Sequence, residues 1–318
     1  MSEATGIKKG INDALRKFTK NEESKFRLWT SIKMTMIPII SVIIVGWMFI
    51  LLLEVDFIFF KSFELTGIEN FRVTYYDYIF DKLSNLALYL SILFIFLILT
   101  GVYVSDILLR PFRIIGEYCE EALENEKASY NPDFFNDLSL LTRFSEFFFS
   151  IIDNFRKAGS VQKVEIPSKY TKIHNPKFET TFFFHYSLYL FISFSLISAI
   201  TYIFAMSLHD ELLNFARETL PQQKQVMIFL EGQNDIFRSV LIAFSVTQLS
   251  LYIWLASHLY LKVSTPAFGV FATMRSFLKG NHKARVHLIG FPYLRPACRK
   301  LNKYLDFIER NYSEKKTE

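Results

Sequence analysis

The sequence predicts an all-α membrane protein with four transmembrane helices, because four long stretches of the chain are apolar and uncharged. These stretches are residues 34–53, 83–105, 180–208 and 239–261. A helix of about 20 mostly apolar residues spans the hydrocarbon core of a bilayer. Hydrophobic residues make up 51% of the chain. A core helix of a soluble protein can explain one such stretch, but four of them favour membrane spans.

The distribution of lysine and arginine predicts the orientation of these spans, since cytoplasmic loops carry an excess of both residue types. Residues 1–33 hold eight Lys or Arg against four acidic residues, and residues 262–318 hold twelve against four. The two outer segments have the opposite balance, with three against six in residues 54–82 and three against five in residues 209–238. We therefore expect both termini and the central loop to be cytoplasmic. The first span begins too late and is too long for a cleavable signal peptide, so it is interpreted as an anchor.

This topology accounts for the net charge of +5 without a nucleic-acid-binding function. The N-terminal segment places Ile7, Ile11 and Phe18 on one helical face between lysines, which is typical of an amphipathic helix on anionic lipid. A positively charged flank with no further role is the alternative. Cys119 and Cys298 both fall on the predicted cytoplasmic side, where thiols stay reduced.

The chain contains an internal duplication with a large period. Each half predicts a transmembrane helix, a short outer loop, a second transmembrane helix and an amphipathic helix pair. The link between the halves, KAGSVQKVEIPSKYTKIHNPK, is polar and contains two prolines, so it is interpreted as a connector. The expected segments are a cytoplasmic amphipathic N-terminal segment (1–33), two transmembrane helices with a short periplasmic loop (34–109), the first helix pair (110–157), the connector (158–179), two further transmembrane helices with a short periplasmic loop (180–262), the second helix pair (263–312) and a tail (313–318).

The first helix of each pair directly follows a span. LLRPFRIIGEYCEEALENE follows the second span, and KVSTPAFGVFATMRSFLKGN follows the fourth. Proline is tolerated near a helix start, where its missing N–H is not needed. A shift of 155 residues aligns two prolines and three apolar positions: Pro111 with Pro266, Ile115 with Val270, Cys119 with Met274 and Leu123 with Leu278. Each helix is therefore expected to begin close to its proline and to carry one apolar face.

The second helix of each pair carries an apolar stripe at spacings of three and four, which places the stripe on one helical face. The stripe of the first copy consists of Leu141, Phe144, Phe148, Ile152 and Phe155, and a shift of 153 residues carries it to Leu294, Ala297, Leu301, Leu305 and Ile308. Pro296 can occupy only the first turn of its helix, so we expect Leu294 just before that helix. A few apolar matches can arise by chance in a chain this hydrophobic. The repeated order of elements after a span is the stronger support for a duplication.

The segment FLKGNHKARVHL, residues 277–288, predicts a helix end followed by an extended connector. Gly280 can adopt the left-handed conformation that ends a helix, and Asn281 tolerates it. Val286 and Leu288 alternate with polar residues, as in an extended chain with one apolar side. Such a connector returns the chain toward the membrane, so that the second helix runs parallel to the first.

This arrangement resembles the HAMP linker of bacterial receptors and histidine kinases. In that family a membrane-proximal proline, a helix end with glycine and a polar residue, apolar connector residues and an asparagine in the second helix recur in this order. Pro266, Gly280, Val286 and Asn302 match this order in the second copy.

The first copy is a weaker match to the family. Asp137 and Leu138 resemble the acidic-Leu start of the second helix. The glycine is missing, however, and Asn125 stands near its position. An unrelated amphipathic helix pair on the inner leaflet is the alternative for both copies.

The resemblance implies a parallel four-helix bundle made from two helix pairs. Pairing within one chain gives a pseudo-two-fold four-helix bundle, and pairing between chains gives a homodimer. The residues implied in the bundle core or in signal relay are Pro111, Leu123, Leu141, Phe148, Ile152, Pro266, Leu278, Gly280, Val286, Leu301, Asn302, Leu305 and Ile308. The output domain of the family is not present after Ile308. The resemblance therefore implies a non-catalytic signal relay or adaptor in the bacterial inner membrane, whose partners are membrane lipids and a separate cytoplasmic or membrane protein.

The sequence contains no motif for catalysis, for a cofactor or for a metal ion, and we expect the protein not to be an enzyme. Its six histidines do not cluster with other ligands at metal-binding spacing. The main alternative function is a transporter or channel subunit built from two parallel two-helix repeats. The absence of charge from the middle of every span argues against that function. Gln248 is the most polar group within a span and is expected to bond to a neighbouring helix.

Overall fold

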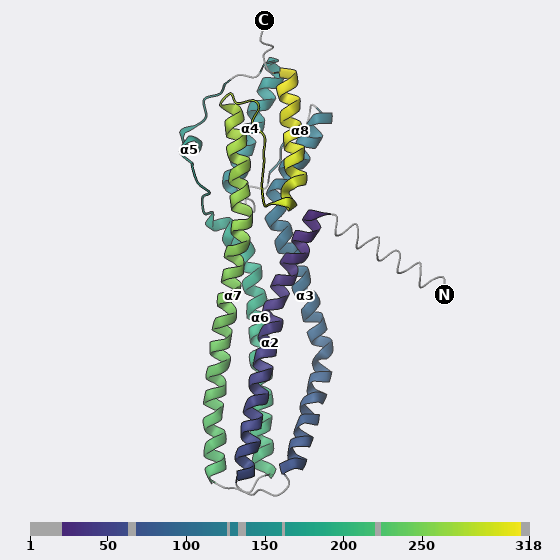
Figure 1. Cartoon of the computed structure of the whole chain (residues 1–318), viewed down its shortest axis with the longest axis vertical. Helices are drawn as coiled ribbons and strands as arrows, with labels where there is room; N and C mark the ends of the chain where they lie inside the picture. The colour runs from purple at the N-terminus through teal and green to yellow at the C-terminus, as the bar shows by residue number, and fades with distance from the viewer. Residues whose placement is uncertain are drawn as a thin grey trace, which may run out of the picture. The chain divides into compact units, whose positions relative to one another are not determined.

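The computed structural model describes residues 21–62, 68–125, 128–132, 138–160, 163–219 and 224–312 of the chain. All regular structure within these ranges is helical, so the expected all-α class is confirmed (Figure 1). The elements are α2 (Glu22–Ser62), α3 (Ile68–Glu124), α4 (Ser139–Ala158), α5 (Ser168–Thr171), α6 (Thr180–Thr219), α7 (Lys224–Leu278), the 3-10 helix η1 (Pro292–Leu294) and α8 (Arg295–Tyr312). Of the predicted N-terminal segment, residues 1–20 with Ile7, Ile11 and Phe18 lie outside the described residues, and residues 22–33 belong to α2. Asp137 also lies outside the described residues.

Helices α2, α3, α6 and α7 are each long and apolar enough to cross a membrane. They contain 41, 57, 40 and 55 residues. Large apolar side chains remain exposed along them; Trp47 is 64% exposed, Leu88 68% and Trp254 66%. Such a surface is unfavourable in water and is solvated by the acyl chains of a bilayer. These four helices indicate a multi-pass membrane protein.

The two outer segments, residues 54–82 and 209–238, are mostly helical. The outer loops are therefore much shorter than the sequence predicts. Helix α2 continues to Ser62 and α3 already begins at Ile68, while α6 ends at Thr219 and α7 begins at Lys224. Some of the polar side chains in this region are paired between helices. Glu54 accepts hydrogen bonds from Arg72 at 2.7 Å and from the hydroxyl of Tyr76 at 2.8 Å. Because these groups have partners, the helices can extend beyond the apolar stretches.

The chain divides into two compact units. The bundle unit consists of Met1–Thr30, Val102–Leu188 and Ala256–Glu318, and the span unit consists of Ser31–Gly101 and Tyr189–Leu255. Helices α2, α3, α6 and α7 each supply residues to both units, whereas α4, α5, η1 and α8 belong to the bundle unit alone.

The span unit has an apolar core to which all four of its helices contribute. Its buried members include Phe49, Leu53, Phe60, Tyr75, Leu208, Leu212, Leu230, Phe237 and Leu241. Within this unit the hydroxyl of Ser198 in α6 donates to Oε1 of Gln248 in α7 at 3.1 Å. The expected bond between Gln248 and a neighbouring helix is thus confirmed.

Gly101 lies at a close approach of α3 to α2 in the span unit, because a Cβ at this position would lie only 2.5 Å from the Cα of Ser31. We expect Gly101→Val to lower the melting temperature of the purified protein by several degrees, since the two backbones must separate; overpacking of this kind costs about 1–3 kcal/mol. The matched control is Gly46→Val in α2, where an added Cβ meets nothing within 4 Å. Equal melting temperatures for the two variants would contradict the close contact of α2 and α3.

Candidate functional site: the four-helix bundle

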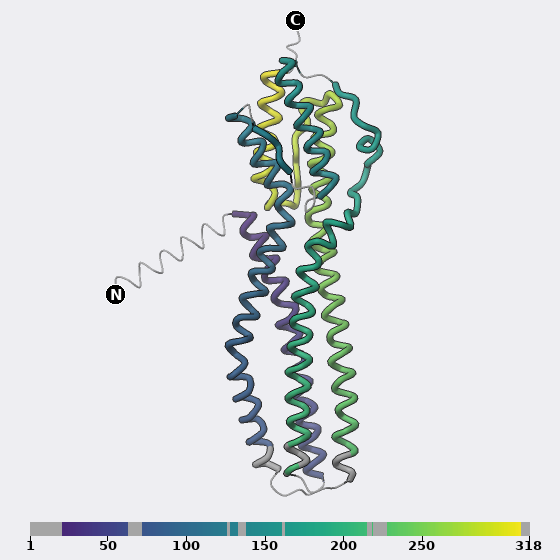
Figure 2. The backbone as a smooth tube through the Cα atoms, turned by 180° about the vertical axis from the view of Figure 1, so that it is seen from behind, coloured from purple at the N-terminus to yellow at the C-terminus, as the bar shows by residue number. Residues whose placement is uncertain are grey.

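Four helical segments pack together in the bundle unit, namely residues 102–124 of α3, residues 256–278 of α7, and the whole of α4 and α8 (Figures 1 and 2). Tyr118 of α3, Phe149 of α4 and Tyr304 of α8 form an aromatic triad. Its ring centroids lie 4.3 Å apart for Tyr118 and Phe149, 6.0 Å for Phe149 and Tyr304, and 6.2 Å for Tyr118 and Tyr304. The triad therefore joins three of the four helices directly.

Helix α7 joins the same core through α4. The rings of Phe144 and Phe271 lie 4.6 Å apart, and those of Phe148 and Phe277 lie 6.2 Å apart. Residue numbers rise together in both helices along this interface, so α4 and α7 run parallel.

Helices α3 and α8 also run parallel to each other. Gly116 of α3 lies against Ala297 of α8, with only 3.1 Å between an added Cβ at 116 and the Cα of Ala297. One turn further along both helices, Lys300 and Glu120 form an ion pair at 2.5 Å.

The apolar stripes of the second helices are buried as predicted. All five stripe residues of α4 are at most 6% exposed, and Leu301, Leu305 and Ile308 of α8 are at most 1% exposed. Leu294 is also buried and lies in η1, directly before α8, as expected. Ala297 is only half-buried.

The apolar face of the first helices is confirmed except at one position. Ile115, Cys119, Val270, Met274 and Leu278 are all at most 3% exposed. Leu123 is only half-buried, whereas Ala122 is 0% exposed. Each step of four residues rotates a side chain by about 40° around an α-helix. Two such steps separate Ile115 from Leu123, and in α3 Ala122 takes the inward position instead. The same two steps in α7 leave Leu278 buried, so spacing alone does not account for the difference.

Both prolines lie inside continuous helices, so the helix starts predicted near Pro111 and Pro266 are wrong. Proline lacks the N–H that would bond to the carbonyl four residues earlier. For Pro266 this carbonyl belongs to Lys262, and the hydroxyl of Tyr293 donates to it at 2.7 Å. Tyr293 in η1 thus replaces the hydrogen bond that Pro266 removes from α7.

This replacement predicts a coupling between Tyr293 and Pro266. Tyr293→Phe removes the donor to the Lys262 carbonyl and should destabilise the protein by about 1 kcal/mol, the net worth of a neutral hydrogen bond. In a Pro266→Ala background the helix supplies its own N–H, so the same Tyr293→Phe change should cost little. The four melting temperatures of this double-mutant cycle measure the coupling; additive effects would contradict the proposed replacement.

The connector between α7 and α8 has the predicted conformation. Gly280 has φ +100°, and the N–H of Asn281 reaches back to the carbonyl of Ser276 at 3.2 Å, so the helix end at Gly280 is confirmed. Val286 is 4% exposed. The side-chain amide of Asn302 accepts from the N–H of Val286 at 2.8 Å and donates to its carbonyl at 3.0 Å. One asparagine therefore satisfies both backbone groups of the buried connector residue.

A second link joins this connector to α8. The Arg285 guanidinium pairs with Asp306 at 2.6 Å and also with Glu309. It donates to the carbonyls of His282 and Ala284 as well. The connector is therefore fixed on α8 by Arg285 at its surface and by Asn302 beneath it.

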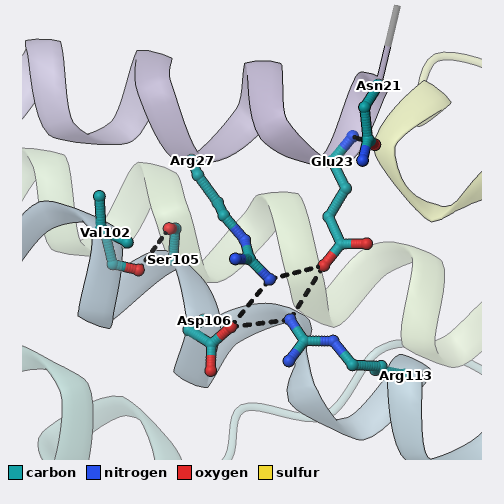
Figure 3. Close-up of polar contacts among 7 residues, drawn as sticks. All are labelled: Asn21, Glu23, Arg27, Val102, Ser105, Asp106 and Arg113. Atoms are coloured by element: carbon teal, nitrogen blue, oxygen red, sulfur yellow. Dashed lines mark hydrogen bonds and ion pairs between the residues drawn. The ribbon is translucent and has the colours of Figure 1, made fainter. Parts of the chain in front are cut away.

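The start of α2 is held against α3 by four charged residues, which we call the charged clasp: Glu23, Arg27, Asp106 and Arg113. Figure 3 shows that the two arginines and two carboxylates alternate around one point. Arg27 pairs with Glu23 and with Asp106 at 2.9 Å, and Arg113 pairs with Glu23 at 2.9 Å and with Asp106 at 2.8 Å. Each side chain keeps 26–41% of its surface exposed.

Two contacts next to the charged clasp complete this region. Asn21 caps α2 by accepting the N–H of Glu23 on its side-chain oxygen at 3.1 Å (Figure 3). Phe26 of α2 stacks on Tyr293 with ring centroids 4.3 Å apart. Sequence reasoning missed this region, because its charged groups are separated by up to 90 residues and no local pattern connects them.

Both cysteines are buried and free. Burial raises the pKa of the Cys298 thiol to about 11. The reactive thiolate is therefore scarce at neutral pH, which is typical of a packing role. Within the described ranges no group of three His, Cys, Asp or Glu side chains lies close enough to hold a metal ion.

Comparisons of the chain with protein-family models, with curated proteins and with solved structures gave no match.

Proposed function

We propose that the protein is a non-catalytic relay or adaptor of the bacterial inner membrane, in which a HAMP-like bundle couples transmembrane helices to a separate cytoplasmic partner. The observation that carries the proposal is that two helix–connector–helix copies of one chain bury their apolar stripes in one four-helix core. Most corresponding positions are buried alike, as at Phe148 and Leu301 or Ile152 and Leu305. Two pairs differ, because Leu123 and Ala297 are half-buried whereas Leu278 and Phe144 are fully buried. Equal burial at most matched positions supports a pseudo-two-fold relation between the copies.

The connector of the second copy supports the likeness to HAMP linkers. The helix end at Gly280, the buried Val286 and the bond from Asn302 to the backbone of Val286 occupy the order that the family shows. Because Asn302 holds the connector against the second helix, the residue has a structural task that explains its place in the pattern.

A relay needs a physical link between membrane and bundle. Helices α3 and α7 are each one unbroken helix that supplies residues to the span unit and to the bundle unit. A shift or rotation of either helix at one end therefore acts on residues at its other end. The relay further requires two packings of the bundle that differ by a few kcal/mol, which an input can bias. Within the bundle unit, the charged clasp holds the start of α2 against α3, and Phe26 holds it against η1.

Pairing within one chain can be tested with a disulfide. A Cβ at position 116 would lie 3.3 Å from the Cβ of Ala297, close to the roughly 3.5–4.5 Å range found in disulfides. We expect Gly116→Cys/Ala297→Cys to form a disulfide within the monomer, seen as a mobility shift in a non-reducing gel. The single variants and the wild type, whose two cysteines are buried, should not shift. Products of twice the monomer mass would instead indicate pairing between chains.

The relay itself can be tested without knowledge of the partner. Gly101→Val alters the span unit, whereas α4 and α8 lie wholly in the bundle unit. We expect this substitution to change the hydrogen-exchange rates of amides in α4 and α8 by at least tenfold. The rates are measured far below the melting temperature, because exchange then reports local opening of the structure. Gly46→Val should leave these rates unchanged. A change confined to the span unit would contradict the relay.

A further inference from the structure

A hollow of about 510 Å³ lies in the bundle unit between the start of α4, the connector with α5, and the first turn of α6. Arg143, Lys169 and Lys177 line it. An adjoining hollow of about 480 Å³ shares Arg143, Lys169 and Tyr170 with it. The first hollow falls within the roughly 300–1,000 Å³ range of small-molecule sites.

The wall formed by the connector is held in place by α7. Arg275 donates to the carbonyl of Tyr170 at 2.9 Å and to that of Ile173 at 2.7 Å. The hydroxyl of Tyr260 accepts from the N–H of Glu179 at 2.7 Å and donates to the carbonyl of Lys177 at 3.0 Å. Figures 1 and 2 both show the connector along the outer side of α7. The hollow is therefore preformed.

The charge of the lining favours an anion. Its single acidic residue, Glu179, accepts the N–H groups of Ser139 and Leu140 at the start of α4, so its negative charge is already met by a helix N-terminus. Arg143, Lys169 and Lys177 form no salt bridge with any residue in the described part of the chain. Three cations that form no salt bridge within the described ranges therefore face this hollow, and the one carboxylate of the adjoining hollow, Glu146, is not paired with them there.

An apolar surface continues from the hollow along α6. Thr181 lines the hollow, and Phe184 and Leu188 follow it on the same helical face at steps of three and four. Phe184 is 68% exposed and Leu188 54% exposed. This helix is long and apolar enough to cross a membrane. A cationic hollow at the head of an exposed apolar face matches the two parts of a lipid, a charged headgroup and acyl chains.

We propose that this hollow binds the phosphate headgroup of an acidic phospholipid, with the acyl chains along the face of α6 that carries Phe184 and Leu188. Arg143, Lys169 and Lys177 contact the headgroup. The site does not depend on the relay, because its argument uses only the lining charges, the cavity and the exposed face of α6.

The test is lipid binding to the full-length protein in a neutral detergent, measured by native mass spectrometry with phosphatidylglycerol and with phosphatidylcholine. The site variant is Arg143→Gln/Lys169→Gln/Lys177→Gln. The control variant is Lys157→Gln/Lys163→Gln/Lys279→Gln, which removes three exposed charges elsewhere in the bundle unit. All substituted side chains are exposed, so both variants should keep the wild-type melting temperature, which is measured in the same experiment. If the triple variant does not fold, Arg143→Gln alone replaces it as the site variant.

We expect the Kd for phosphatidylglycerol to rise at least tenfold in the site variant, at least threefold in Arg143→Gln alone and less than twofold in the control. Phosphatidylcholine should bind weakly to all four proteins. An equal loss in the site and control variants would show that charge in general attracts the lipid, and would overturn the site. Displacement of phosphatidylglycerol by inorganic phosphate at equal concentration would show recognition of phosphate alone, and would overturn the lipid as the occupant. Neither result bears on hydrogen exchange in α4 and α8, so this site and the relay can fail separately.

Discussion

An amphipathic helix pair with one apolar face cannot cover that face by itself, and this constraint organises the bundle unit. The stripes of α4 and α8 meet the buried faces of α3 and α7 in one core, where Phe144, Phe148, Leu305 and Ile308 have no exposed surface. Burying one large apolar side chain stabilises a fold by about 1.5–3 kcal/mol, whereas a partly exposed ion pair contributes about 0–1 kcal/mol. Packing therefore holds the bundle together, and the charged clasp fixes where the start of α2 lies against it.

The two helix pairs, which the sequence predicts to be copies of one unit, meet this constraint with different local chemistry. In the second copy Asn302 satisfies the backbone of Val286, and Tyr293 compensates for Pro266. In the first copy the residue before α4, Leu138, has no side-chain cap, and Glu179 supplies the missing acceptors from beyond the helix. In a homodimer every substitution occurs on both sides of the axis. Because both helix pairs belong to one chain, each can change alone, and α4 borders the cationic hollow whereas α8 does not.

Features that depend on local periodicity could be predicted from the sequence, and features that depend on distant partners could not. The stripe containing Phe148 and Ile152 and the glycine that ends α7 follow from spacing and from backbone preference, and both are confirmed. The sequence favours helix starts at the two prolines, because a proline within a helix leaves a carbonyl unpaired. The compensating hydroxyl of Tyr293 lies 31 residues from Lys262, and only the fold brings it there. The charged clasp escaped prediction for the same reason, since Glu23 and Arg113 are ordinary charges until α2 and α3 meet.

The hydroxyl of Tyr293 has a mechanical consequence. A helix that lacks one internal hydrogen bond bends more easily at that point than elsewhere. At Pro266 the substitute donor belongs to the turn that begins α8 and is stacked on Phe26 of α2. Bending of α7 at Pro266 would therefore act on η1, which directly precedes α8, and on the start of α2, because the side chain of Tyr293 contacts both α7 and Phe26.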